Sequence, residues 1–469
     1  MAKKLNITII ASECTPFVKV GGVADVIGSL PQALSLHDAN IRVILPRYKT
    51  VDVSTFEKSD QPFVVSTGDG DTECTVYTKT VENIKYIFID NEKYISNGGV
   101  YDALEDDTKT IDDVKRFCFF NMAVCSFMGT TKTPDIIHAH DWHASLVPFL
   151  CASDTPTILT IHNILYQGRW EQEPIAAFLK RDDLPAFAGK CNMLRTGIEH
   201  AKAITTVSPT YAQEITTPEF GQGLDDVLNH YKDKLSGIIN GIDTATFDPE
   251  TDNHIETQFS TNNREKKIEN KIALQEELGL PKNPSAPLIG VVSRLTPQKG
   301  LDLLPLILPK LDSLDSQVVV LGTGDKDIET ALQNSAGDSQ KVLIEFNIET
   351  AQKIYAASDM FIIPSRFEPC GLTQMIAMRY GAVPIVRDTG GLHDTVQNYT
   401  EKNDSINGNG FVFKKAAATE LLHSIKRALA VYHDQPRHWD TLRANAMKTD
   451  FSWDVSALAY LSLYKKLLR

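Results

Sequence analysis

Short runs of Ile, Val and Leu recur along the chain, separated by longer segments in which apolar residues fall at helical spacing. This pattern is typical of buried parallel strands joined by crossover helices. In the first half it predicts strands at residues 6–11, 41–45, 85–89, 135–138, 157–161 and 203–207. In the second half it predicts strands at residues 288–293, 317–321, 341–346, 360–364, 383–386 and 410–413. Two such series indicate an α/β fold with two Rossmann-like, doubly wound domains.

The boundary between the two series lies near residues 240–252, where Gly, Asp, Pro and Thr cluster and periodicity is lost. We therefore expect an N-terminal domain over residues 1–243 and a C-terminal domain over residues 244–448. A charged amphipathic helix at 263–278 leads into the second sheet. Residues 449–469 form a final helix, with Ser452 as a plausible N-cap and basic residues near its end.

Composition narrows the class of protein. The 469 residues are 42% hydrophobic and 23% charged, which excludes disorder and fibrous repeats. A net charge of −13 argues against a nucleic-acid partner, which needs a basic face. No apolar stretch approaches the roughly 18 residues of a membrane span, and the start resembles a strand more than a signal peptide. The seven cysteines are scattered and fit a reducing compartment better than a disulfide or zinc framework, so we expect a cytoplasmic protein.

Open parallel sheets bind ligands beyond the carboxyl ends of their strands, so two facing sheets predict an interdomain cleft. After the first strand, Gly21 and Gly22 open a helix, and Lys19 adds a positive charge beside them. Glycines at such a turn let a ligand approach the backbone N–H groups. The alternative is an ordinary turn with a solvated lysine.

A second basic segment follows a strand in the other half of the chain. Arg294 stands at the strand end and Lys299 precedes the next helix. A guanidinium fork and an ammonium group can neutralise a diphosphate leaving group without a metal. A surface salt bridge is the competing interpretation.

The segment with the most candidate binding residues is 364–375, which again follows a strand and begins a helix. Glu368 could bind sugar hydroxyls while the backbone amides of Gly371, Leu372 and Thr373 bind phosphate. Otherwise Glu368 is a partner of the helix dipole and Cys370 a small core residue.

Two histidine clusters, residues 138–143 and 160–163, follow strands of the first half. Their spacing suggests a metal, but no Cys or Glu completes a familiar ligand pattern, so no metal is expected. His162 is better placed as a hydrogen-bond donor to a sugar or a stabiliser of positive charge at carbon. Asp141 and Trp142 suit a carbohydrate, which has hydroxyl edges and an apolar face.

The sequence contains two Asp-x-Asp triplets, and such pairs of carboxylates can hold a divalent cation. Asp69 and Asp71 lie in a sequence typical of a tight turn. Asp325 follows a strand, where it either binds a ligand or caps the next helix. Neither triplet supports a metal, and the preceding Gly322-Thr-Gly324 lacks the third glycine of a dinucleotide fingerprint.

Taken together, these segments resemble the bacterial glycogen synthase and plant starch synthase family over essentially the whole chain. The segments that carry the resemblance are Lys19-Val-Gly-Gly-Val-Ala-Asp25, His138-Ala-His-Asp-Trp-His143, residues 206–212, Asn240-Gly-Ile-Asp243, Ser293-Arg-Leu-Thr-Pro-Gln-Lys-Gly300, residues 365–374 and Thr389-Gly-Gly-Leu392.

The resemblance implies the glycosyltransferase type B fold, with the last helix crossing back to the first domain. It implies transfer of glucose from ADP-glucose to the non-reducing end of an α-1,4-glucan, with retention of configuration. ADP-glucose is then a substrate, and neither a cofactor nor a metal is required.

The resemblance also assigns roles to single residues. Lys19 contacts the donor beside Gly21 and Gly22, Arg294 and Lys299 bind its diphosphate, and residues 370–373 line the same site. Glu368 holds the glucose, while His162 and Asp141 lie near the reacting carbon. Tyr101, Trp142 and Asp141 fall on the acceptor side.

Three positions depart from the family pattern. Phe346 stands where the family often has a tyrosine stacked on adenine, so the ring face is kept and a hydroxyl lost. Val20 replaces the threonine of many bacterial members, and Arg195 replaces a usual lysine. These changes leave the preference between ADP-glucose and UDP-glucose open.

Two other classes of protein compete with this interpretation. A nucleotide-sugar epimerase has the same two-sheet plan but needs no glucan, and a non-catalytic binding protein would not need Lys19, Arg294, Lys299 and Glu368 together. Attack of the acceptor on the face that ADP leaves fits retention, and a covalent route through Glu368 stays open. Because the expected residues come from both halves, we also expect domain closure that excludes water.

Overall fold

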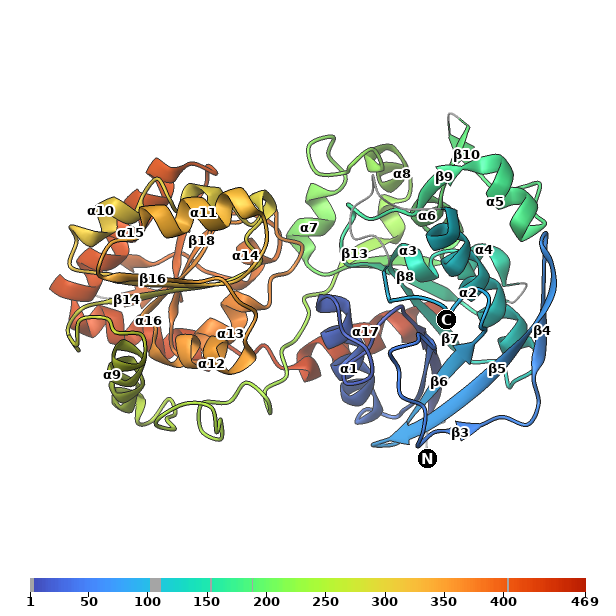
Figure 1. Cartoon of the computed structure of the whole chain (residues 1–469), viewed down its shortest axis with the longest axis horizontal. Coiled ribbons are helices and arrows are strands. Elements are labelled where there is room, and N and C mark those ends of the chain that lie inside the picture. Colours follow the sequence, from blue (N-terminus) through green and yellow to red (C-terminus); the bar gives the residue numbers. More distant parts are fainter. Residues whose placement is uncertain (1–3, 102–110, 152–153, 188, 403–404) are drawn as a thin grey trace. The chain divides into compact units, whose positions relative to one another are not determined.

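The computed structural model describes residues 4–101, 111–151, 154–187, 189–402 and 405–469. The chain divides into two compact units (Figure 1). Unit 1 comprises Met1–Gly241 together with Trp453–Arg469, and unit 2 comprises Ile242–Ser452. The C-terminal segment therefore belongs to the first unit.

Unit 1 is built on a ten-stranded sheet in the described part of the chain, with the order β13-β12-β8-β7-β1-β2-β6-β5-β3 and β4 paired to β5. The strands are β1 (Leu5–Ile10), β2 (Ala39–Pro46), β3 (Glu57–Lys58), β4 (Phe63–Thr67), β5 (Gly70–Val81), β6 (Ile84–Asp90), β7 (Ile136–His140), β8 (Thr157–Ile161), β12 (Ala203–Thr206) and β13 (Leu235–Gly237). The strands from β13 to β6 pair in parallel, and β5 joins β6 in the antiparallel sense. All six strands predicted for this half are present.

Helices enclose this sheet, and a small three-stranded sheet, β10-β11-β9, accompanies it. These elements are α1 (Gly22–Ser35), α2 (Ile111–Gly129), α3 (Asp141–Ala144), α4 (Val147–Leu150), β9 (Arg169–Glu171), α5 (Gln172–Leu179), β10 (Ala186–Phe187), β11 (Lys190–Asn192), α6 (Met193–His200), α7 (Pro209–Glu214), α8 (Asp225–His230) and α17 (Trp453–Leu467).

The last helix, α17, is part of the hydrophobic core of unit 1. It lies beside α1 (Figure 1), and Trp453, Tyr460 and Tyr464 are buried in the same cluster as the apolar face of α1. The segment just after α1 is also linked to α17 at the surface, where His37 contacts Asp454 Oδ1 at 2.7 Å. Burying three large aromatic side chains stabilises this arrangement by several kcal/mol, at about 1.5–3 kcal/mol for each large apolar side chain.

Unit 2 contains a six-stranded parallel sheet, in the order β16-β15-β14-β17-β18-β21. Its strands are β14 (Leu288–Val292), β15 (Gln317–Leu321), β16 (Gln340–Leu343), β17 (Met360–Ile363), β18 (Val383–Arg387) and β21 (Phe411–Phe413), and β19 (Thr400–Lys402) pairs with β20 (Ser405–Asn407) outside the sheet. Its helices are α9 (Lys267–Glu277), α10 (Leu308–Asp312), α11 (Lys326–Ser335), α12 (Ile348–Ala357), α13 (Thr373–Arg379), α14 (Gly390–Thr395), α15 (Ala418–Asp434) and α16 (Pro436–Lys448). The six predicted strands of this half are all present, although β16 ends three residues early.

The sequence favours free thiols at the cysteines, but two of them are bonded. Cys125, on α2, and Cys151, just after α4, form a disulfide bond within unit 1. The other five cysteines are free and buried. The sequence does not reveal the pair because its members lie 26 positions apart and only the packing of α2 on α4 brings them together.

None of the helices in the described ranges combines the length and the apolar content that crossing a bilayer would require.

Candidate functional site

The loop between β1 and α1 is organised by a glutamate that the sequence interpretation did not single out. Glu13 is almost fully buried, and its Oε2 accepts the backbone N–H groups of Val20 and Gly21 at 2.7 and 2.8 Å. Tyr101 donates its hydroxyl to Oε1 at 2.9 Å and also contacts Ser12 Oγ at 2.8 Å. One carboxylate thus fixes the backbone immediately before α1.

Lys19 lies at the exposed end of this loop. Its Nζ contacts Asp25 Oδ1 at 2.7 Å, and both side chains are substantially exposed to solvent. An exposed pair of this kind contributes little to stability, about 0–1 kcal/mol, so Lys19 can exchange this partner for an anion. Gly22 begins α1, and a Cβ built there would meet open space. Tyr101 contacts this loop through Glu13, and its predicted place on the acceptor side stays a prediction.

The carboxyl ends of β7 and β8 bring Asp141 and His162 together. Asp141 follows β7 directly with a left-handed backbone, φ 55°, and its Oδ1 accepts the backbone N–H of His162 at 2.7 Å. Burial raises the pKa of Asp141 to about 7, although the N–H groups of His162 and Asn163 oppose that rise. Burial lowers the pKa of His162 to about 3, which keeps its ring neutral.

Trp142 does not occupy the place predicted for it. The side chain is 3% exposed, its ring packs edge-on against Phe117 at 5.0 Å, and Gly168 lies directly against one face. A Cβ at Gly168 would fall 2.3 Å from the indole. The prediction that Trp142 offers a free ring face to a sugar is therefore not supported, because the ring is part of the core of unit 1.

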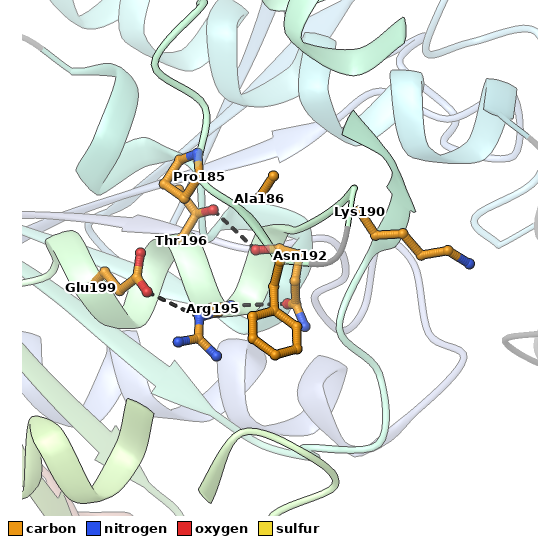
Figure 2. Close-up of a pocket in the computed structure, with 8 residues that line it drawn as sticks. Pro185, Ala186, Lys190, Asn192, Arg195, Thr196 and Glu199 are labelled. Atoms are coloured by element: carbon orange, nitrogen blue, oxygen red, sulfur yellow. Dashed lines mark hydrogen bonds and ion pairs between the residues drawn. The ribbon is translucent and has the colours of Figure 1, made fainter. Parts of the chain in front are cut away.

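Arg195 lies on α6 beside a pocket of about 110 Å³ (Figure 2). Its guanidinium pairs with Glu199 at 3.0 Å and with Asp226 at 3.1 Å. Asn192 caps α6 by accepting the backbone N–H of Arg195. The pocket is lined by Pro185, Ala186, Phe187, Lys190, Asn192, Arg195, Thr196 and Glu199. The charge of Arg195 is thus already balanced by two carboxylates.

In unit 2, the ends of β14 and β17 bring Lys299 and Glu368 into direct contact. Lys299 Nζ lies 2.9 and 2.6 Å from the two carboxylate oxygens of Glu368, and both side chains are largely buried. Ser365 donates its hydroxyl to Glu368 Oε2 at 2.9 Å, and the backbone carbonyl of Glu368 accepts the N–H of Gly391 at 3.0 Å. The structure therefore places these two predicted residues in one rigid cluster.

Arg294 differs from Lys299 in having an exposed side chain that makes no hydrogen bond or ion pair with the described residues. The backbone N–H groups of Gly371, Leu372 and Thr373, at the start of α13, likewise donate to no acceptor within the described part of the chain. First-turn N–H groups and an unpaired guanidinium are the donors that anionic oxygens prefer.

Two glycines allow the loops of this region to pack closely. Gly371 has φ 73°, a left-handed conformation that L side chains rarely adopt. Gly391 lies against Cys370, whose carbonyl oxygen would be 2.0 Å from a Cβ at that position. Cys370 itself is buried, as the core interpretation expected.

Phe346 projects into solvent between β16 and α12, with 82% of its surface exposed. A ring in this position has a free face for an aromatic base. Asp325 is the N-cap of α11, accepting the N–H of Asp327 at 2.9 Å, which decides between the two roles considered for it. Asp69 lies in the turn between β4 and β5, and Asp71 pairs with Ser66 at the start of β5, so this triplet is part of a hairpin. Across the described residues, no three His, Cys, Asp or Glu side chains gather in a way that could hold a metal.

Comparison with known proteins identifies the family of this chain. The model of the starch synthase catalytic domain matches residues 6–230, and that of glycosyl transferases group 1 matches residues 275–442. A glycogen synthase from Bacillus cereus (strain Q1) is 41% identical over 99% of this chain and 100% of its own length. The chain belongs to the glycogen and starch synthase family. A glycogen synthase from Streptococcus mutans is 40% identical over the same shares of both chains.

Solved structures support the same family assignment. The catalytic domain of starch synthase IV from Arabidopsis thaliana, bound to ADP and acarbose, superposes with a TM-score of 0.88 at 34% identity, covering 99% of both chains. Sucrose-phosphate synthase from Thermosynechococcus elongatus shares the fold alone, with a TM-score of 0.63 at 17% identity. The predicted type B glycosyltransferase fold and the glycogen or starch synthase activity are confirmed.

Three contacts around the predicted site residues of the two units escaped the sequence interpretation: those of the buried Glu13, the support of Glu368 by Ser365, and the hydrogen bond between His140 and His162. Glu13 lies three residues after the buried strand β1, which is a usable signal for a ligand or loop-organising carboxylate. The other two depend on side-chain pairing that spacing alone does not reveal.

Proposed function

We propose that the chain transfers glucose from ADP-glucose to the 4-hydroxyl at the non-reducing end of an α-1,4-glucan, with retention at the anomeric carbon and without a cofactor or metal. The observation that carries this proposal is the Lys299–Glu368 cluster beside unpaired phosphate donors. A carboxylate suits sugar hydroxyls, and an adjacent cation with free N–H groups suits a diphosphate. The Arabidopsis starch synthase IV structure, bound to ADP and acarbose, supports a nucleotide and a saccharide as ligands.

Unit 2 would hold the donor. The bond that breaks joins glucose C1 to an oxygen of the diphosphate, which leaves with the bonding electrons. Arg294, Lys299 and the N–H groups of residues 371–373 stabilise the negative charge on that oxygen. Losing one such donor commonly lowers the rate by about 10²–10³. Phe346 offers its exposed ring to the adenine.

Glu368 would bind hydroxyls of the transferred glucose. Ser365 and the N–H of Gly391 hold the residue at its side chain and backbone, so little reorganisation is needed when sugar arrives. Lys299 then has two anionic partners, the carboxylate and the diphosphate, and links the two parts of the donor. Positive charge grows at C1 as the diphosphate leaves, as in other glycosyl transfers.

In unit 1, Lys19 would offer its ammonium group to an anionic group of the substrate, next to the N–H of Gly22, while the N–H of Gly21 stays bound to Glu13. His162 would meet the sugar near the reacting carbon, and Asp141 would hold the loop that carries it. The acceptor 4-hydroxyl attacks C1 on the face that the diphosphate leaves, and its proton passes to the departing phosphate oxygen. That route gives retention and balances the proton without a protein base. We place the reaction in the cytoplasm.

The first experiment measures ADP release from ADP-glucose with and without glycogen. Release that requires glycogen, with new glucose found in the polymer through α-1,4 links, supports the proposal. Conversion of the donor sugar in the absence of glycogen would instead identify an epimerase. A β-linked product would refute retention.

The second experiment compares two Glu→Gln variants of unit 2. Glu368→Gln should lower kcat by about 10² or more, because a site donor or acceptor is lost at the reacting sugar. Glu277→Gln is the matched control: Glu277 pairs with Lys353 at 2.8 Å on the surface formed by α9 and α12, so transfer should be unchanged. Equal activity in both variants would remove Glu368 from the site.

A further inference from the structure

A row of buried rings lies behind His162 in unit 1. His140, the last residue of β7, has its Nδ1 2.9 Å from His162 Nε2, and the two rings stack at 5.2 Å. His138 packs on the other side of His140, with ring centroids 4.1 Å apart. Tyr464, on α17, closes the row through its hydroxyl, 2.8 Å from His138 Nδ1.

These histidines are neutral at ordinary pH. Burial lowers the pKa of His138 and His162 to about 3 and that of His140 well below its usual value, and the charges of neighbouring histidines add to the effect for His138 and His140. A neutral imidazole has one nitrogen with a proton and one with a lone pair. In the His140–His162 bond, one ring must therefore donate and the other accept.

The surroundings of His140 decide the direction. Its Nε2 is fully buried and has no hydrogen-bond partner in the described part of the chain. A proton on Nε2 would leave an orphaned N–H donor, and Nδ1 would then be the acceptor. Buried orphan N–H groups are rarer than under-used acceptors, and leaving a buried donor unpaired costs about 1–3 kcal/mol. The proton of His140 therefore belongs on Nδ1, where it is donated to His162.

His138 does not change this assignment, because both of its nitrogens are already paired. Nδ1 meets the Tyr464 hydroxyl, and Nε2 meets Thr160 Oγ1 at 2.6 Å. Both hydroxyls can donate or accept, so His138 takes either tautomer without affecting His140.

We infer that His140 is a positioning residue that locks His162 in the tautomer with its proton on Nδ1. Since His162 Nε2 accepts from His140, Nδ1 must hold the proton, and Nδ1 makes no hydrogen bond with any described residue. His162 consequently presents a donor, not a lone pair, to an oxygen of the sugar. Asp141 fixes the backbone of His162 and His140 fixes its ring.

This inference rests on the proposed function for the importance of His162, but the tautomer itself is measurable without activity. The protein is labelled with [15N]histidine, and long-range proton–nitrogen correlations distinguish the two tautomers of each ring. Loss of one signal set in His162→Ala assigns His162 among the 12 histidines. A pyrrole-type Nδ1 in His162 supports the inference, and a pyrrole-type Nε2 overturns it.

Two substitutions of His140 then test its action on transfer. In His140→Asn the side-chain amide takes the place of the Nδ1–H, so the His162 tautomer and most of kcat should be retained. In His140→Gln the amide reaches the position of Nε2, and His162 loses its donor. We expect the Nδ1–H signal to be lost and kcat to fall by about 10²-fold, the effect of one misplaced donor. Tyr464→Phe, which alters only the far end of the row, should leave the His162 signals unchanged.

The outcomes distinguish failure of the positioning role of His140 from failure of the proposed function. Equal kcat in His140→Asn and His140→Gln, with His162→Ala inactive, would overturn the positioning role of His140 while leaving the proposed function intact. Full activity in His162→Ala would remove His162 from the proposed function, and with it the role of His140 in transfer. Circular dichroism of each variant shows whether the fold is kept. Retained activity in His140→Asn would show that an N–H donor at the position of Nδ1 is sufficient.

Discussion

The carboxylate of Glu13 should determine the order of the loop that carries Lys19. Glu13→Ala removes the acceptor of two backbone N–H groups, those of Val20 and Gly21. Each hydrogen bond to a charged group contributes about 1.5–3 kcal/mol. Lys19 and Val20 are exposed, so water replaces part of this energy once the loop moves, and we expect a net loss of about 2 kcal/mol in the local opening free energy.

Hydrogen–deuterium exchange measures this loss directly. A decrease of about 2 kcal/mol speeds exchange of the Val20 and Gly21 amides by about 30-fold, since 1.4 kcal/mol corresponds to tenfold. Glu13→Gln keeps one acceptor oxygen and should give an intermediate rate. Asp25→Asn removes the partner of Lys19 without touching these amides and serves as the control.

A second readout connects the loop to transfer. If Lys19 contacts the donor, Glu13→Ala should raise the KM for ADP-glucose more than it changes the KM for glycogen. Wild-type exchange rates at both amides in Glu13→Ala would refute the assigned role of the carboxylate.

Four further predictions concern unit 1. Titration of thiols in denatured, unreduced protein should find five, and seven after reduction; seven before reduction would contradict the Cys125–Cys151 bond. Breaking this bond, which spans 26 residues, should destabilise unit 1 by about 3.5 kcal/mol in the chain-entropy description, measured by denaturant unfolding of Cys151→Ser. Because burial raises the pKa of Asp141 to about 7, the folded state keeps a proton that the unfolded state releases, so the contribution of Asp141 to stability falls as pH rises from about 4 to 7. The lowered pKa values of His138 and His162 act in the opposite sense, so the contribution of these two residues falls as pH drops from about 6.5 to 3. Two histidines outweigh one carboxyl, so thermal melts should show stability rising with pH between about 4 and 6.5, and Asp141→Asn should steepen that rise; an unchanged slope in Asp141→Asn would contradict the raised pKa, and a flat profile in both proteins would contradict the burial of the histidines as neutral rings.

Much of the fold follows from the hydrophobic pattern because buried parallel strands are nearly continuous in apolar residues. The strands β8 and β15 have the predicted limits, Thr157–Ile161 and Gln317–Leu321. The antiparallel hairpin of β4 and β5 was missed, since its strands alternate polar and apolar residues at the edge of the sheet and include Thr, Glu and Lys. Edge strands have only one buried face, so their signal is weaker.

Contacts between candidate site residues could be predicted where those residues come just after the ends of parallel strands. Lys299 and Glu368 stand 69 positions apart, yet each follows a strand of the same parallel sheet, and they meet at 2.6 Å. Trp142 shows where this reasoning fails, because a strand-end position does not say whether a side chain turns toward ligand or core. The presence of Gly168 against its ring decides that, and no local pattern connects the two.

The most direct test of the account is a donor competition on glycogen. Equal concentrations of ADP-[14C]glucose and UDP-[3H]glucose are supplied together, and the two labels are counted in the isolated polymer. We predict that 14C predominates and that the label is released as glucose by an α-1,4-specific glucosidase. Predominance of 3H, or polymer without either label, would contradict the claim that this chain builds an α-1,4-glucan from ADP-glucose.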